Sequence, residues 1–224
     1  MYMLRNNSRM QVLFTLVLVL FASAVARAQT ASDAPRKYLP PSEQVKLLRE
    51  PNGLAAVAKI VGHLELRDDG EIWGMPNLDS LIEGSTQIVE GTIIGSESQL
   101  SVDGDDISTR YVMSVSRTMK GPVSIEVAFY AHGGTIEFPN GTSAHMATLD
   151  TDNIRKGGQY IVFLKDEDGR KVVHAPVAAV IVTSVEKNAV STLDDKDVHT
   201  EGIRKDMSGM TRGELIQLIL NRAN

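Results

Sequence analysis

One uninterrupted alternation of apolar with polar or small side chains runs through Val123-Ser124-Ile125-Glu126-Val127-Ala128-Phe129. Successive side chains of a β-strand point to opposite faces, so this period of two predicts a half-buried strand. A second alternating run, Thr109–Thr118, precedes it beyond the turn sequence Lys120-Gly121-Pro122. Two neighbouring strands, each with one apolar face, predict a β-sheet packed on a core.

Further strand patterns lie on both sides of this pair. Ile88–Ile94 is rich in β-branched residues and contains Gly91, with Gly95 directly after it. Glycine inside a strand marks a bulge or a sharp bend, and a bent strand can serve both halves of a barrel. Three strand patterns follow toward the C-terminus: Tyr160–Leu164, Lys171–His174 and Ala178–Val185. The turn sequence Asp166-Glu167-Asp168-Gly169 separates the first two of these.

Short helices are predicted before and after the strands. Leu78, Leu81 and Ile82 recur at helical spacing just before the first strand. Thr211-Arg212-Gly213-Glu214 has the pattern of a capping box and stands ahead of the apolar run 215–220, which predicts a C-terminal helix.

The region before residue 76 is less regular. Ser42 is a good N-cap for a short helix that Pro51 would stop. Residues 53–75 fit a helical face in their first half and a strand in their second half, so both structures remain open there.

The order of these segments resembles a group of uncharacterised exported bacterial β domains, whose layout is similar to the OB-type barrels of the netrin and metalloproteinase-inhibitor families. The resemblance spans residues 76–190 and rests on the helix at Leu78–Ile82, Ile88–Ile93, Tyr111–Gly121, Ile125–Gly134 and Lys156–Leu164. It implies a mainly β fold, an OB-like barrel of five to six strands with short flanking helices. The inhibitors depend on an N-terminal cysteine, and this chain has no cysteine, so their inhibitory residues have no counterpart here.

The N-terminus has the features of an export signal. Arg5 and Arg9 precede the apolar run 12–25, and small residues at Ala26 and Ala28 predict cleavage between Ala28 and Gln29. We therefore expect an exported protein, periplasmic or secreted, with no membrane anchor in its mature form, because position 29 offers no cysteine for a lipid. The predicted divisions are a signal peptide at 1–28, a spacer with a short helix at 29–75, the barrel at 76–190, and an acidic linker with a C-terminal helix at 191–224.

Charge makes one class of partner improbable. The chain has 23 Lys and Arg residues against 28 Asp and Glu residues, a net charge of −5. The signal segment holds Arg5, Arg9 and Arg27 and no acidic residue, so cleavage lowers this charge by three, to −8. Binding to nucleic acid requires a basic surface, so we expect no nucleic-acid partner.

No catalytic motif stands out. The chain lacks the Gly-x-Ser-x-Gly string of a serine hydrolase, and its five histidines show no zinc-type spacing. No cofactor is implied. His132 and His145 lie on one glycine-rich stretch and could converge with Glu137 or Asp150, although a plain loop role is the simpler interpretation. The face formed by residues 131–146 is the expected contact surface, with His132, Gly133, Gly134, Phe138 and His145 as its binding residues.

Three hypotheses for function follow. The first is an exported, non-enzymatic binding or interaction module for an unknown protein or small ligand of the envelope or medium. The alternative is an extracytoplasmic, metal-dependent hydrolase that uses His132 and His145 with a carboxylate. A third is a structural role in which the C-terminal helix docks a partner.

Overall fold

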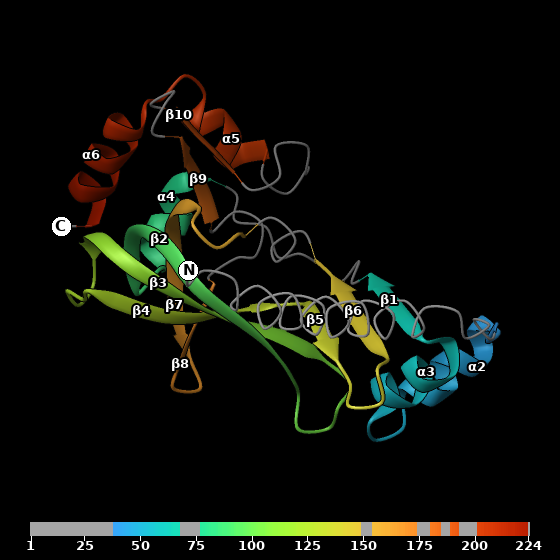
Figure 1. Cartoon of the computed structure of the whole chain (residues 1–224). Coiled ribbons are helices and arrows are strands. Elements are labelled where there is room, and N and C mark those ends of the chain that lie inside the picture. Colours follow the sequence, from blue (N-terminus) through green and yellow to red (C-terminus); the bar gives the residue numbers. More distant parts are fainter. Residues whose placement is uncertain are drawn as a thin grey trace, which may run out of the picture.

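The computed structural model describes residues 38–67, 77–148, 154–173, 180–184, 189–192 and 201–223. The predicted signal peptide, its cleavage between Ala28 and Gln29, and the spacer up to residue 37 lie outside the described residues. Within them the fold is mainly β with short helices, as the sequence predicts (Figure 1). None of the helices so described has the length and apolar character needed to cross a membrane.

The larger sheet has seven strands in the order β10-β9-β7-β2-β3-β4-β8. Its members are β2 (Gln87–Leu100), β3 (Ile107–Lys120), β4 (Glu126–His132), β7 (Gln159–Glu167), β8 (Arg170–Val173), β9 (Val180–Ser184) and β10 (Ala189–Thr192). β8 also pairs with β7, so the hydrogen-bonded succession β2, β3, β4, β8, β7 returns to β2. The β4–β8 pair is parallel and has Tyr130 opposite Val172.

Two residues, Asp168 and Gly169, connect β7 to β8 in a hairpin. Asp168 and Gly169 both have positive φ, 49° and 75°. A two-residue hairpin turn of this type needs positive φ at both central positions, and Asp-Gly supplies them at low cost. The turn predicted from Asp166-Glu167-Asp168-Gly169 is thereby confirmed.

Glycine bends β2 as predicted. The register between β2 and β3 shifts at Ile88/Val89, Glu90/Gly91 and Ile93/Gly95. A Cβ at Gly91 would lie 2.2 Å from the Ser114 carbonyl oxygen, so only glycine allows this approach of the two strands. The bend lets β2 pair with β7 along its first half and with β3 along its whole length.

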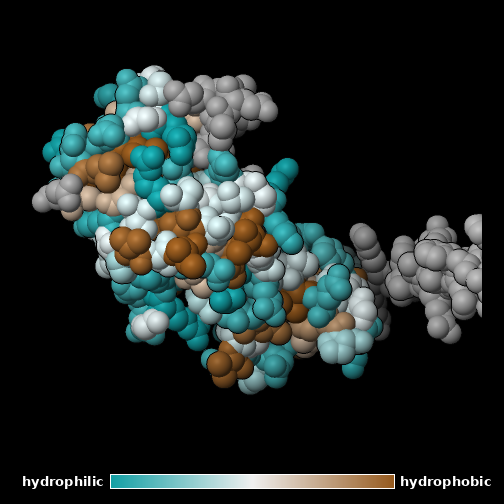
Figure 2. Space-filling model, turned by 60° about the vertical axis from the view of Figure 1, so that its left-hand side comes forward, coloured by the Kyte–Doolittle hydropathy of each residue, from teal (hydrophilic) through white to brown (hydrophobic). Residues whose placement is uncertain are grey.

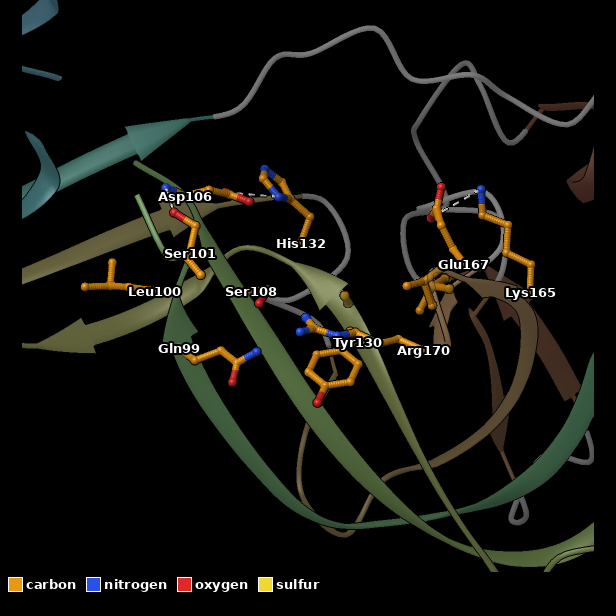
Figure 3. A pocket seen from close by; sticks show the side chains of 14 residues that line it. Gln99, Leu100, Ser101, Asp106, Ser108, Tyr130, His132, Lys165, Glu167 and Arg170 are labelled. Carbon is orange, nitrogen blue, oxygen red and sulfur yellow. Dashed lines mark hydrogen bonds and ion pairs between the residues drawn. The ribbon is translucent and has the colours of Figure 1, made fainter. Parts of the chain in front are cut away.

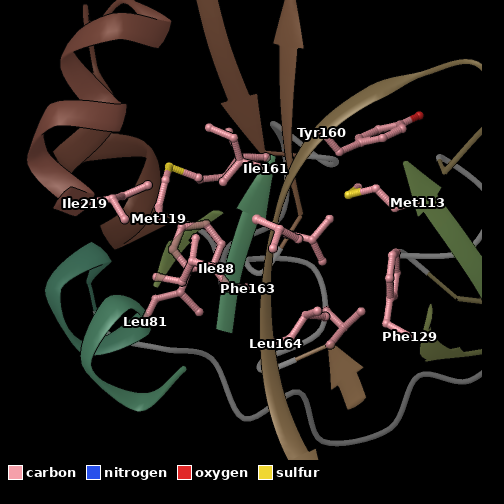
Figure 4. Packing of buried hydrophobic residues seen from close by; sticks show 14 of the residues in the cluster. Leu81, Ile88, Met113, Met119, Phe129, Tyr160, Ile161, Phe163, Leu164 and Ile219 are labelled. Carbon is pink, nitrogen blue, oxygen red and sulfur yellow. The ribbon is translucent and has the colours of Figure 1, made fainter. Parts of the chain in front are cut away.

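One buried cluster packs between this sheet and the helices. Phe129, Phe163 and Leu164 are fully buried, together with Leu81 and Ile219 from the helices (Figure 4). The predicted alternation therefore has its buried face at Val127 and Phe129, and the pattern continues to Ala131.

The first part of that alternation behaves differently. Val123 and Ile125 are 90% and 88% exposed, so the prediction that they belong to the buried face is wrong. β4 begins only at Glu126. Both residues lie in the connection from β3, before the chain turns its apolar side toward the core.

Three helices gather at one end of the larger sheet (Figure 1). They are α4 (Leu78–Gly84), α5 (Glu201–Met207) and α6 (Arg212–Ala223). The helices predicted around Leu78–Ile82 and after Thr211 are confirmed. The sequence predicts an acidic linker between residue 191 and the C-terminal helix, but the structure places α5 within it, and Ile203 and Met207 of this helix are buried in the core.

Polar contacts fix both ends of α4. The Asp206 carboxylate accepts a hydrogen bond of 2.9 Å from the Leu78 backbone N–H, and Asn77 caps the helix through Ser80 N–H. At the other end, the Lys120 ammonium donates to the carbonyls of Ile82 and Glu83. These groups satisfy backbone atoms that a helix end leaves without partners.

The start of α6 has the predicted capping box. The Glu214 carboxylate accepts hydrogen bonds from the backbone N–H and the hydroxyl of Thr211, at 2.7 and 2.8 Å. Both bonds stabilise the ionised form and lower the pKa of the Glu214 carboxyl. Leu215, Ile216 and Ile219 pack into the protein's own core.

A second, smaller unit contains the N-terminal helices. It comprises α2 (Pro41–Leu48), α3 (Gly53–Val61) and a sheet in the order β1-β6-β5, with β1 (His63–Arg67), β5 (Gly134–Glu137) and β6 (Ser143–Ala147). β1 is parallel to β6, so the ambiguous region after residue 53 holds a helix and then a strand. Leu54, Val57 and Leu64 form its own apolar cluster with Ala144 and Met146.

The cap predicted for α2 is wrong. The helix begins at Pro41, its cap position is Pro40, and no side chain caps it, so Ser42 lies inside the helix. Proline is favoured at the first helical position because it has no N–H to satisfy there. Proline geometry therefore sets this helix start, which serine was expected to set.

An ion pair with a buried carboxylate joins α6 to the larger sheet. The Glu90 side chain on β2 is 4% exposed and forms a two-point contact with the Arg212 guanidinium, with Nη2 at 2.7 Å from Oε2 and Nε bonded to Oε1. Paired donors in this planar arrangement match a carboxylate well. Arg212 thus neutralises a carboxylate that the sheet holds away from water.

Removing that cation should destabilise the fold. Arg212→Met leaves Glu90 buried without its partner, and losses of this kind cost about 3–5 kcal/mol. We expect the free energy of unfolding, measured by urea denaturation, to fall by about 3 kcal/mol. The control Arg222→Met removes an exposed partner of Asp79 and should cost less than about 1 kcal/mol. Equal losses in the two variants would contradict a special role for the pair with the buried carboxylate.

Candidate functional site

A cleft lies at the end of the larger sheet where β7 turns into β8. It has a volume of about 680 Å³ (Figure 3). Its walls come from the β2–β3 turn, from β3 and β4, and from the β7–β8 hairpin. Segments distant in sequence meet there because β8 pairs with both β7 and β4.

Tyr130 and Arg170 form the centre of the cleft. The Arg170 guanidinium carbon lies 5.4 Å from the centroid of the Tyr130 ring, which is a cation–π contact. Val172 is opposite Tyr130 in the parallel pair, and Arg170 is two residues before it on the same side of β8. The strand pairing therefore determines the position of the guanidinium over the ring.

Two exposed ion pairs flank this centre (Figure 3). His132 Nδ1 lies 3.2 Å from Asp106 Oδ1, and Lys165 Nζ lies 3.6 Å from Glu167 Oε2. All four side chains are 38–56% exposed. Exposed pairs contribute only about 0–1 kcal/mol, so a ligand can rearrange them at little cost.

Hydrogen bonds hold the β2–β3 turn in place. The Ser101 hydroxyl accepts from the backbone N–H groups of Asp105 and Asp106, each at 3.1 Å. The first residues of the α3 region brace the same turn, because Asn52 N–H donates to the Asp103 carbonyl at 2.9 Å. The smaller unit thereby supports one wall of the cleft.

Of the five binding residues predicted from the sequence, only His132 lines this cleft. His145 lies on β6, with its Nδ1 2.9 Å from the Thr135 hydroxyl. Phe138 is half-buried and packs against the apolar cluster of the smaller unit. His132 and His145 thus have different polar neighbours on different sheets.

Gly133 and Gly134 turn the chain from β4 into β5. The Gly133 carbonyl accepts a hydrogen bond of 2.7 Å from the Thr109 hydroxyl. Gly134 has φ of 130°, and a Cβ there would lie 2.2 Å from Thr109 Oγ1 and 2.6 Å from Ser98 Oγ. These contacts give the glycine pair a structural role in joining the two sheets.

The hydrolase alternative requires a metal. In the part of the chain that the structure describes, no three His, Asp or Glu side chains are grouped so that they could hold a metal ion. Asp150, which the sequence offered as a third ligand, lies outside the described residues.

A hydrogen-bonded row on the smaller sheet was not predicted. His63 contacts Ser143 Oγ through Nδ1 and Glu65 Oε1 through Nε2, both at 2.6 Å. Its connectivity is that of a serine, a base and an acid, but His63 and Glu65 are 39% and 63% exposed. None of these three residues lines the cleft. Catalysis of acyl transfer requires a site that holds the substrate next to hydrogen-bond donors for the oxyanion. The row is best explained as side-chain contacts on one face of β1 and its neighbour β6.

Sequence reasoning missed Tyr130 and Arg170. Tyr130 directly follows the alternating run that ends at Phe129, and Arg170 follows the Asp168-Gly169 turn. Both stand next to features that the sequence revealed. Their meeting depends on the parallel pairing of β4 with β8, which no local pattern encodes.

Lys171, next to Arg170, has a different environment. Its ammonium lies 3.0 Å from Asp166 Oδ1 and donates the hydrogen bond that most lowers the pKa of that carboxyl, and the Thr86 hydroxyl acts in the same direction. Lys171 does not line the cleft. It is therefore a matched cation for comparison with Arg170.

No family model matches this chain, and no curated protein matches it in sequence.

The structural role of Gly134 is testable by substitution. Gly134→Ala places a Cβ against two hydroxyls and forces alanine into positive φ, so we expect a loss of about 3 kcal/mol in unfolding free energy. Gly141→Ala also has positive φ, but nothing lies within 4 Å, and it should cost about 1 kcal/mol. Thermal denaturation of both variants measures the difference, and equal losses would refute the close contact.

Proposed function

We propose that this protein is an exported, non-enzymatic binding module built on an OB-like barrel, with the cleft around Tyr130 and Arg170 as its ligand site. Its partner is a protein or small ligand of the envelope or the medium. The proposal of export rests on the sequence of residues 1–28.

The strand pairings support the barrel. The succession β2, β3, β4, β8, β7 closes on β2, and a bent first strand is shared between both halves. The third of these strands along the chain, β4, is parallel to the fifth, β8. This arrangement is also what the resemblance to netrin-type and metalloproteinase-inhibitor-type barrels implies.

The observation that carries the function is where the cleft lies on that barrel. OB barrels bind ligands on the face of their second and third strands, between the loop joining strands one and two and the loop joining strands four and five. Here the corresponding elements are β3, β4, the β2–β3 turn and the β7–β8 hairpin, and all four line the cleft.

The side chains that line the cleft are suited to binding a ligand. An aromatic ring, a guanidinium, an amide at Gln99 and a hydroxyl at Ser108 offer a flat apolar surface and hydrogen bonds. A few directed polar groups on an apolar surface are typical of ligand sites. Fold alone does not imply function, so the proposal depends on this set of side chains.

Exposed apolar side chains do not by themselves mark the ligand site. On the face in Figure 2, apolar side chains form separate spots among hydrophilic ones. The exposed large apolar residues of the described chain include Val102 at the edge of the cleft and Val123 and Ile125 outside it. Scattered exposed apolar residues are normal for a protein surface.

Ligand screening by NMR tests the proposal. Uniformly labelled protein, purified after expression of the full chain, is titrated with neutral disaccharides, small carboxylates and short peptides. We expect at least one probe to shift amide signals of cleft residues, and Tyr130→Ala to weaken that probe about tenfold, as loss of an aromatic platform predicts. Ile125→Ala, outside the cleft, is the control. Shifts confined to other surfaces, or none at all, would overturn the cleft as the site.

A further inference from the structure

One cation in the cleft has no acidic partner in the part of the chain that the structure describes. Lys165 Nζ lies 3.6 Å from Glu167 Oε2, and Asp106 Oδ1 lies 3.2 Å from the imidazole of His132, which is charged only when it is protonated. Arg170 has no carboxylate partner among the described residues, and its contact there is the face of Tyr130. A guanidinium presents five donors in a fixed plane and cannot lose its charge, so its hydrogen-bonding edge remains available for a ligand.

We propose that the cleft binds an organic carboxylate, held by the Arg170 guanidinium over the Tyr130 ring. This inference rests on the proposed function and names the chemical class of its ligand. The guanidinium and a carboxylate pair through two parallel N–H···O hydrogen bonds, which fixes the orientation of the ligand as well as its charge. The ring holds the guanidinium in position before the ligand arrives, so less side-chain freedom is lost on binding.

The acidic neighbours argue against a more highly charged anion. Asp106 and Glu167 both line the cleft, and both would repel a phosphate dianion more strongly than a carboxylate. Lys165, the other permanent cation there, is already close to Glu167. The Arg170 guanidinium, which no carboxylate of the described residues engages, can pair with one carboxylate of a ligand.

Gln99 and Ser108 supply further polar groups in the cleft. Gln99 comes from the end of β2 and Ser108 from the start of β3 (Figure 3). Their amide and hydroxyl groups can donate to or accept from further polar groups of the ligand. The group that carries the carboxylate is either an aromatic ring or a hydroxyl-bearing chain. Titrations with one pair of probes of each kind distinguish the two.

The experiment compares probes that differ only in the carboxylate. NMR titrations use benzoate against benzamide, and glucuronate against glucose, with inorganic phosphate as a further anion. We expect the carboxylate in at least one pair to bind at the cleft at least tenfold more tightly than its neutral partner. The pair whose carboxylate has the higher affinity identifies which kind of ligand, aromatic or hydroxyl-bearing, the cleft prefers.

Variants then assign the effect to the guanidinium. Arg170→Gln should remove the preference for the carboxylate, and Arg170→Lys, which keeps the charge without the planar fork, should lose at least fivefold in affinity. Lys171→Gln removes a neighbouring cation already engaged by Asp166 and should leave affinity unchanged. Far-UV circular dichroism of each variant checks that the fold is retained.

Distinct results overturn this inference. Equal affinity for a carboxylate and its neutral partner, tighter binding of phosphate, or unchanged affinity in Arg170→Gln would each reject a carboxylate site. In those cases binding of a neutral probe at the cleft would still uphold the binding module. If no carboxylate shifts any cleft signal, the inference fails, and the neutral and peptide probes of the wider screen decide the proposed function separately.

Discussion

The two-residue turn at Asp168 and Gly169 is the constraint on which the site depends. Positive φ at both residues sends β8 straight back along β7. β8 then reaches β4, where Val172 lies opposite Tyr130. That single parallel contact links β4 to β8, so the hydrogen-bonded order β2-β3-β4-β8-β7 leads back to β2. It also places the Arg170 guanidinium over the Tyr130 ring. The geometry of one tight turn is thus connected directly to the chemistry of the cleft.

Other contacts keep the surrounding elements in register. Arg212 neutralises the buried Glu90 and ties α6 to β2, while Asp206 ties α5 to the first turn of α4. These contacts lie at the helical end of the larger sheet (Figure 1). At the cleft, Asn52 of the smaller unit holds the β2–β3 turn. Long-range polar contacts therefore supplement a core that has no disulfide to stabilise it.

Local patterns predicted much of the secondary structure and little of the site. Alternation revealed β4, and the Thr211–Glu214 capping box revealed α6, because both signals depend on neighbouring residues only. Alternation was wrong at Val123 and Ile125, since it cannot tell where a strand enters a sheet. The pairing of β1 with β6 joins segments about 80 residues apart, which no local period records. His132 was found through its glycine neighbours, whereas Tyr130 and Arg170 meet only after the strands have paired.

Backbone NMR contacts between Tyr130 and Val172 test the central claim most directly. If β8 joins β4 as a parallel neighbour, nuclear Overhauser effects should link the backbone protons around these two residues, and the amides at their pairing should exchange slowly with solvent. If β8 instead pairs with β7 alone, no such cross-strand effects will appear, and its outward amides will exchange as those of an exposed edge. The second result would contradict both the closed order of strands and the cleft built on it.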